Sequence, residues 1–189
     1  MPKWVNLPNG LTLLRLALAP FVVAAILGHR PWMAFWLFFF ASWTDIFDGM
    51  AARRWGSHTQ VGAYLDPIAD KCLLSGVFLA LAVVHQVPWW VVAIVLGRDV
   101  YILIASLILM RFTSIRRFPP SIWGKLSTFA QIATVGIGMG GALLQLRVLD
   151  TFSSAMLWVC AALALWSGLH YTWRGARLAL AGGHPAEVR

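Results

Sequence analysis

Long apolar stretches, separated by short polar breaks, dominate the pattern of this chain. A hydrocarbon core of ~30 Å requires about 20 apolar residues in a helix, and the chain offers six stretches of that kind. Each break between them collects the charged residues, Pro or Gly that end helices. The pattern therefore predicts an all-α integral membrane protein with six transmembrane helices, which cover residues 11–28, 31–54, 61–85, 88–110, 122–146 and 151–173.

The basic residues predict which side of the membrane each end of the chain occupies. With the N-terminus inside, most Lys and Arg residues fall in cytoplasmic segments, and only Arg30 and Arg147 fall in outer loops. This bias favours both termini in the cytoplasm. Residues 1–10 are expected to form a short interfacial segment in which Trp4 enters the headgroup region. The spans leave too little chain for a soluble domain, so residues 1–189 are predicted to form one membrane domain.

The composition agrees with this interpretation. Of the 189 residues, 60% are apolar and 12% charged, and the net charge is +8. Basic residues beside a membrane are attracted to anionic lipid, so the charge predicts a lipid-facing surface and no nucleic-acid partner. The expected location is a bacterial inner membrane, with the active site on the cytoplasmic side.

The acidic residues are unusually placed. Four of the seven, Asp45, Asp48, Asp66 and Asp70, lie between positions 45 and 70 in or beside apolar sequence. A carboxylate at the centre of a membrane helix costs ~2.5 kcal/mol or more, so four of them require compensating cations. Asp45 and Asp48 share one helix face, as do Asp66 and Asp70. The short connection after Arg53 predicts that the two helices are antiparallel neighbours, which would bring the four carboxylates together near the cytoplasmic surface.

These oxygen ligands favour particular metals. Carboxylates suit Mg²⁺, Mn²⁺ or Ca²⁺, whereas zinc prefers Cys and His, which the group lacks. Four negative charges match two divalent cations, an arrangement that clamps a phosphoryl group during displacement. Around them, Gly49, Ala52 and Gly62 remove side-chain bulk, and Arg53 is placed to grip a phosphate. The residues alone also leave open a small cation or proton transporter, although the inverted repeats and broken helices of such proteins are not visible.

The spacing of these residues identifies a resemblance. Asp45, Asp48, Gly49, Ala52, Arg53, Gly62, Asp66 and Asp70 match D-x2-D-G-x2-A-R-x8-G-x3-D-x3-D, the signature of the CDP-alcohol phosphatidyltransferases. The resemblance implies six transmembrane helices, a homodimer, and two divalent cations, Mg²⁺ or Mn²⁺, held by the four aspartates. It implies that Asp70 is the general base and that CDP lies against Asp48, Gly49, Ala52, Arg53 and Gly62. The reaction would move the alcohol-bearing phosphoryl group of a CDP-linked substrate to an acceptor hydroxyl and release CMP.

Other segments resemble the glycerophospholipid branch of the family, which contains phosphatidylglycerophosphate synthases and cardiolipin synthases that use CDP-diacylglycerol. The similar segments are 6–20, 66–71 and 124–131. Arg98-Asp99 is closer to the cardiolipin synthases, because the other group more often carries Arg-Glu. The favoured acceptor is glycerol-3-phosphate, and the alternative is phosphatidylglycerol. The residues expected to bind the acceptor are Lys71, Arg111, Arg116, Arg117, Lys125, Thr128 and Gln131.

Overall fold

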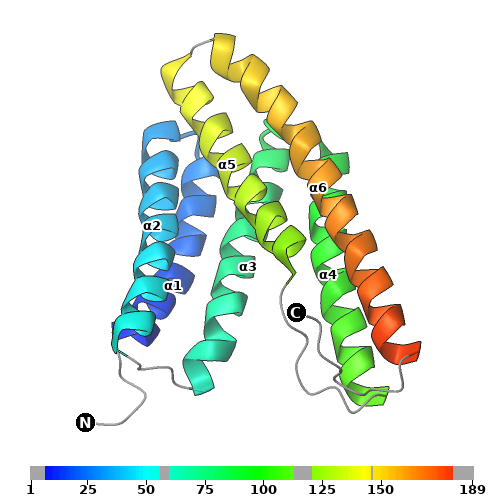
Figure 1. The fold of residues 1–189 in the computed structure, drawn as a ribbon. Coiled ribbons are helices and arrows are strands. Elements are labelled where there is room, and N and C mark those ends of the chain that lie inside the picture. Colours follow the sequence, from blue (N-terminus) through cyan, green and yellow to red (C-terminus); the bar gives the residue numbers. More distant parts are fainter. Residues whose placement is uncertain (1–6, 56–59, 113–120, 146, 181–189) are drawn as a thin grey trace.

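A computed structural model describes residues 7–55, 60–112, 121–145 and 147–180, and the described residues are helical with short turns and no strand. The helices run alternately up and down in one bundle, so α1 begins and α6 ends at the same end of it (Figure 1). All six predicted spans are confirmed as helices. Their bounds are α1 Leu7–Leu27, α2 Pro31–Trp55, α3 Gln60–Val83, α4 Trp89–Phe112, α5 Ile122–Leu144 and α6 Arg147–Leu180.

The membrane character of the bundle is also supported. Four described helices contain apolar windows long enough to cross a bilayer, namely Gly10–Leu27, Trp89–Ser106, Ile122–Leu144 and Thr151–Arg177. Large apolar side chains such as Phe21, Leu103 and Trp158 are more than half exposed on the outside of the bundle. Such a surface suits lipid and would be costly in water. The number of spans and the side of the termini stay predictions.

Helix ends follow local sequence signals. The α1–α2 turn has His29 in the left-handed region, at φ 52°, and Pro31 then begins α2. Proline suits the first turn of a helix because its missing N–H would have no partner there. At α5, the side chain of Ser121 caps the N-terminus by accepting a hydrogen bond from the Gly124 N–H at 3.0 Å. Residues 7–10, expected in an interfacial segment, form the first turn of α1, whereas residues 1–6 lie outside the described residues.

The packing of the bundle centres on α1. α1 packs against both α2 and α3, and in the described part of the chain α2 and α3 do not pack against each other. The two helices run antiparallel, as predicted (Figure 1). Where the end of α2 meets the beginning of α3, the side chains lie outside the described part, so direct contact there stays a prediction. A short connection limits only the distance between the two joined ends, and apolar burial against α1 decides where the helices lie. Fully buried residues from both α1 and α3, such as Val22, Val77 and Phe78, form the core.

Candidate functional site

An ion pair joins α1 to the last aspartate of the acidic motif on α3. Arg15 Nη1 lies 2.5 Å from Asp70 Oδ1, at hydrogen-bonding distance. The Arg15 side chain is 1% exposed, whereas that of Asp70 is 34% exposed. Because an arginine carries its charge at every physiological pH, it gives the Asp70 carboxylate a permanent counter-charge. The Asp70 side chain is therefore one-third exposed while Arg15 holds its Oδ1.

A small cavity lies beside this pair, with a volume of about 40 Å³. Four helices contribute to its wall: α1, α2, α3 and α5. Its polar lining comes from Arg15, Ser42, Asp70 and Thr128, and its apolar lining from Leu73, Leu74 and Ile132. A cavity of this size has room for about three waters, since a single water needs about 10–15 Å³.

A second polar network lies on α3 directly after Asp70. Lys71 Nζ is 2.5 Å from Asp99 Oδ2 on α4, and Asp99 Oδ1 accepts a hydrogen bond from Arg98 Nη1 at 2.6 Å. Arg98 Nη2 also donates to Ser167 Oγ on α6 at 2.5 Å. Lys71 and Arg98 thus neutralise Asp99 between them. The network links α3, α4 and α6, while Arg15 ties the same part of α3 to α1.

The polar residues of α5, expected together at the acceptor site, lie in three different environments. Lys125 is exposed, Thr128 lines the cavity beside Asp70, and Gln131 is fully buried. Thr128 Oγ1 donates to the Gly124 carbonyl at 3.2 Å. Neither amide atom of Gln131 finds a hydrogen-bond partner among the described residues, nor does the buried Ser127 hydroxyl. Only Thr128 of these α5 residues therefore shares a cavity with Asp70.

The remaining motif residues lie on the two expected helices. Asp45, Asp48, Gly49, Ala52 and Arg53 belong to α2, and Gly62 and Asp66 belong to α3. The end of α2 and the beginning of α3 lie at the same end of the bundle (Figure 1). The side chains of these residues lie outside the described part, so their convergence on metal stays a prediction. The Arg111 backbone belongs to α4 but its side chain is not described, and Arg116 and Arg117 lie outside the described residues.

Two polar residues of the cavity were not among the predicted site residues. Arg15 lies in segment 6–20, which resembles the family but predicts no role for it, and Ser42 lies in no segment with a predicted role. A charge inside an apolar span is itself a signal, because it must face a partner or a polar cavity. That signal identifies Arg15 as a residue with a function, but it does not identify its partner. Ser42 carries no such signal, because one hydroxyl is readily tolerated in a membrane helix.

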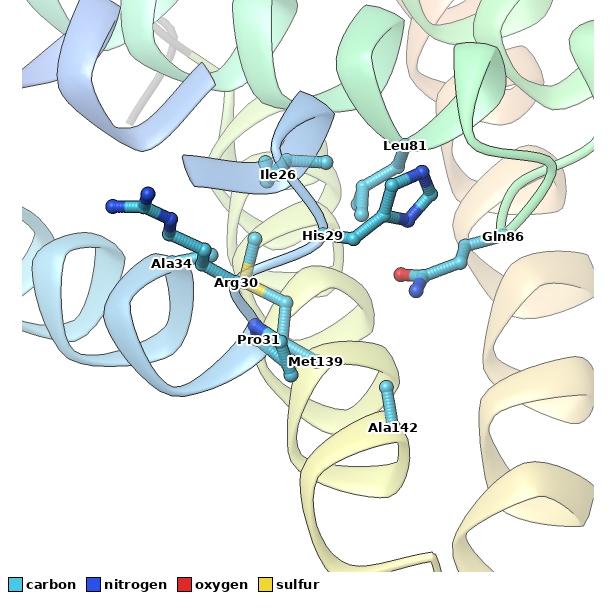
Figure 2. Close-up of a pocket in the computed structure, with 9 residues that line it drawn as sticks. All are labelled: Ile26, His29, Arg30, Pro31, Ala34, Leu81, Gln86, Met139 and Ala142. Atoms are coloured by element: carbon cyan, nitrogen blue, oxygen red, sulfur yellow. The ribbon is translucent and has the colours of Figure 1, made fainter. Parts of the chain in front are cut away.

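A larger cavity, of about 210 Å³, lies at the opposite end of the bundle. The α1–α2 turn, the end of α3 and the end of α5 line it. In Figure 2, the side chains of His29 and Gln86 point toward each other at its rim, while Arg30 extends to the other side. Phosphoryl chemistry requires a proton acceptor and anionic metal ligands, and no acidic residue is among the described residues that line this cavity. Asp70 therefore remains the centre of the candidate site.

The sequence of this chain is similar to those of known CDP-alcohol phosphatidyltransferases. The family model described as CDP-alcohol phosphatidyltransferase matches residues 5–166. A Mycobacterium tuberculosis protein named probable phosphatidylglycerophosphate synthase is 38% identical over 139 residues, which cover 70% of this chain and 65% of that protein's length. A Haemophilus influenzae protein named CDP-diacylglycerol–glycerol-3-phosphate 3-phosphatidyltransferase is 32% identical over 173 residues, 88% of this chain and 91% of that protein. A Drosophila melanogaster protein named probable cardiolipin synthase (CMP-forming) is 31% identical, covering 72% of this chain and 47% of that protein.

Proposed function

This chain belongs to the CDP-alcohol phosphatidyltransferase family, and we propose that it transfers the phosphatidyl group of CDP-diacylglycerol to glycerol-3-phosphate and releases CMP. The observation that carries the proposal is Asp70: it is the last residue of the family motif, it is paired with a buried arginine, and it lines a small cavity with a partly polar wall. The names of the bacterial relatives support both substrates. The membrane helices suit a substrate whose acyl chains remain in the lipid, and we place the enzyme in a bacterial inner membrane with its site on the cytoplasmic side.

The reaction forms one phosphorus–oxygen bond and breaks another. The acceptor hydroxyl oxygen attacks the phosphorus that bears diacylglycerol, and the bond from that phosphorus to the CMP oxygen breaks. Asp70 takes the proton of the attacking hydroxyl, which is the role of a general base. The Asp70 carboxylate is exposed enough to reach an incoming hydroxyl, and Arg15 holds it in one orientation. Proton transfer and orientation are thus supplied by two residues from different helices.

We further propose that Asp45, Asp48, Asp66 and Asp70 hold two divalent cations, Mg²⁺ or Mn²⁺. Asp70 fits this set chemically, because a partly exposed carboxylate is a hard oxygen ligand. When bound, the cations neutralise the pyrophosphate and stabilise the leaving CMP. Gly49, Ala52 and Gly62 leave room for the cytidine of the substrate. Arg53 would bind a phosphate of CDP next to Asp48, which would hold a metal. A homodimer remains part of the proposal.

The competing acceptor is phosphatidylglycerol, which would make the protein a cardiolipin synthase. Two observations favour it: Arg98-Asp99 in the sequence and the Drosophila relative. In the structure, however, both Asp99 carboxylate oxygens are engaged by Lys71 and Arg98. Asp99 therefore serves helix packing, and its identity says little about the acceptor. Glycerol-3-phosphate is the better-supported acceptor. The cation-transporter hypothesis finds no support in the family membership.

The test uses purified full-length protein in detergent with CDP-diacylglycerol and Mg²⁺ or Mn²⁺. Each acceptor is added separately, CMP release is measured, and the lipid product is identified by mass. We expect CMP and phosphatidylglycerophosphate with glycerol-3-phosphate. Product from phosphatidylglycerol alone would overturn the acceptor, and no CMP with any alcohol would overturn the proposed function.

A further inference from the structure

The cavity of about 210 Å³ at the end of the bundle opposite to Asp70 plays no part in the proposed reaction. It has room for roughly 14 waters, at about 15 Å³ for each. The α1–α2 turn and the ends of α3 and α5 line it (Figure 2). We propose that this cavity binds the phosphate group of an anionic phospholipid whose headgroup lies at that surface of the membrane.

The polar part of the cavity wall consists of hydrogen-bond donors. His29 and Gln86 point toward each other on one side, and Arg30 lies on the other side (Figure 2). A guanidinium is always charged and binds phosphate oxygens, and an imidazole and an amide each offer N–H groups. No acidic residue is among the described residues of the wall, so nothing in that wall offsets the charge of Arg30. The lining therefore favours an anion.

The apolar part of the wall favours a lipid over a free phosphate ion. Ile26, Leu81 and Met139 are buried and line the cavity. They can contact the glycerol carbons attached to a lipid phosphate, whereas a free phosphate ion has no apolar part to bury. Trp32, which follows Pro31 of the cavity wall, is 60% exposed. Exposed tryptophans are typical of the membrane–water interface, where phospholipid headgroups lie.

The turn that carries His29 does not need its imidazole. At the end of α1, the His29 N–H donates to the Ile26 carbonyl at 3.0 Å and the Arg30 N–H donates to the Ala25 carbonyl at 2.9 Å. These two bonds close the helix and leave His29 at φ 52°, a conformation that glycine adopts without strain. His29→Gly therefore removes the proposed ligand contact while the turn is kept.

The end of α3 supplies a matched control. There the His85 N–H donates to the Ala82 carbonyl at 3.1 Å and the Gln86 N–H donates to the Leu81 carbonyl at 2.9 Å. His85 has a φ of 61°, so it occupies the same position in the same kind of turn. It is not among the residues that line the cavity. His85→Gly thus makes the same backbone change as His29→Gly without touching the proposed site.

The experiment uses purified full-length protein in detergent, without CDP-diacylglycerol. Dioleoyl phosphatidylserine is the probe, because it is anionic and is neither the donor nor the acceptor of the proposed reaction. Dioleoyl phosphatidylcholine carries the same phosphate without net charge. Lipid retained by the protein is titrated by native mass spectrometry. Wild type is expected to bind phosphatidylserine at least about tenfold more tightly than phosphatidylcholine, since an uncompensated guanidinium favours the net anion.

The variants locate the binding. Arg30→Met should weaken phosphatidylserine binding at least about tenfold and His29→Gly at least about fivefold, the loss expected of hydrogen bonds to a charged group. His85→Gly should stay within about twofold of wild type. The Tm of His29→Gly should equal or exceed that of wild type, so that its lost binding is not lost folding.

Three results would overturn the inference. They are equal affinity of wild type for the two lipids, unchanged binding in Arg30→Met, and equal weakening in His29→Gly and His85→Gly. Displacement of phosphatidylserine by millimolar inorganic phosphate would instead assign the cavity to a soluble phosphate and overturn the lipid as its occupant. Because no substrate of the transfer reaction is present, failure of lipid binding leaves the proposed function standing. Absence of CMP release from wild type would overturn that function and leave the lipid result unaffected.

Discussion

Arg15 on α1 and Asp70 on α3 are joined across the bundle by an ion pair of 2.5 Å, although 55 positions separate them in the chain. The arginine is almost fully buried and the aspartate is one-third exposed. Burying a guanidinium costs free energy that only a matched anion offsets, so the pair ties the orientation of Asp70 to the position of α1. This relationship gives the motif aspartate a partner outside the motif.

Arg15→Met tests whether the pair matters for turnover. The substitution keeps much of the side-chain volume and removes the charge, so Asp70 loses its orienting partner. We expect kcat to fall about 100-fold, which is typical of a removed electrostatic contact at a reacting group. CMP release measures the effect, and Arg30→Met, at the opposite end of the bundle, is the control. Equal rates in Arg15→Met and wild type would show that the ion pair is structural only.

Asp70→Asn tests the general base. The amide keeps the shape of the side chain but cannot take a proton, so turnover should be abolished while CDP-diacylglycerol binding is largely retained. Binding is measured with the labelled lipid and turnover by CMP release. Asp45→Asn and Asp66→Asn should weaken metal binding as well. If Asp70→Asn kept a tenth of the wild-type rate, Asp70 would not be the base.

Metal removal tests the proposed cations. Treatment with EDTA should abolish CMP release, and excess Mg²⁺ or Mn²⁺ should restore it, because carboxylates prefer hard divalent ions. Electron paramagnetic resonance of added Mn²⁺ reports binding independently of activity. Full activity in chelator would contradict the two-cation proposal.

Asp99→Asn tests the network that links α3, α4 and α6. The variant leaves Lys71 and the buried Arg98 without a compensating charge. We expect destabilisation of about 3 kcal/mol, at the lower end for a broken buried pair because Lys71 is partly exposed. Thermal unfolding in detergent measures it. The KM for the acceptor should stay within about twofold of wild type, and a selective rise in that KM would instead place Asp99 or Lys71 at the acceptor.

The last prediction is that basic residues near the α4–α5 connection bind the phosphate of the acceptor. A glycerol-3-phosphate site must neutralise a dianionic phosphate, and Arg116, Arg117 and Lys125 are the proposed cations. Arg116→Gln or Arg117→Gln, each combined with Lys125→Gln, should raise the KM for glycerol-3-phosphate at least about tenfold, the cost of a lost charge-assisted hydrogen bond. The KM for CDP-diacylglycerol is the internal control. Equal changes in both would indicate that these residues only anchor the protein in the membrane.

The local sequence pattern predicted the helices, the acidic motif and the family of this protein. The lengths and ends of the six helices follow from apolar runs and from Gly, Pro and charged breaks, because these depend on neighbouring residues and on the thickness of the bilayer. The motif aspartates and the family follow from the spacing of residues within 26 positions. Such features need no knowledge of which helices touch.

The tertiary structure decided what spacing along one helix cannot. It placed α1 against both motif helices, paired Arg15 with Asp70, and paired Lys71 with Asp99. It also separated Lys125, Thr128 and Gln131, which were expected together at the acceptor site. The physical reason is that an apolar helix has many faces of similar hydrophobicity, so its sequence leaves its rotation and neighbours undetermined. Packing of all the helices together selects the arrangement in which the few buried charges meet opposite charges.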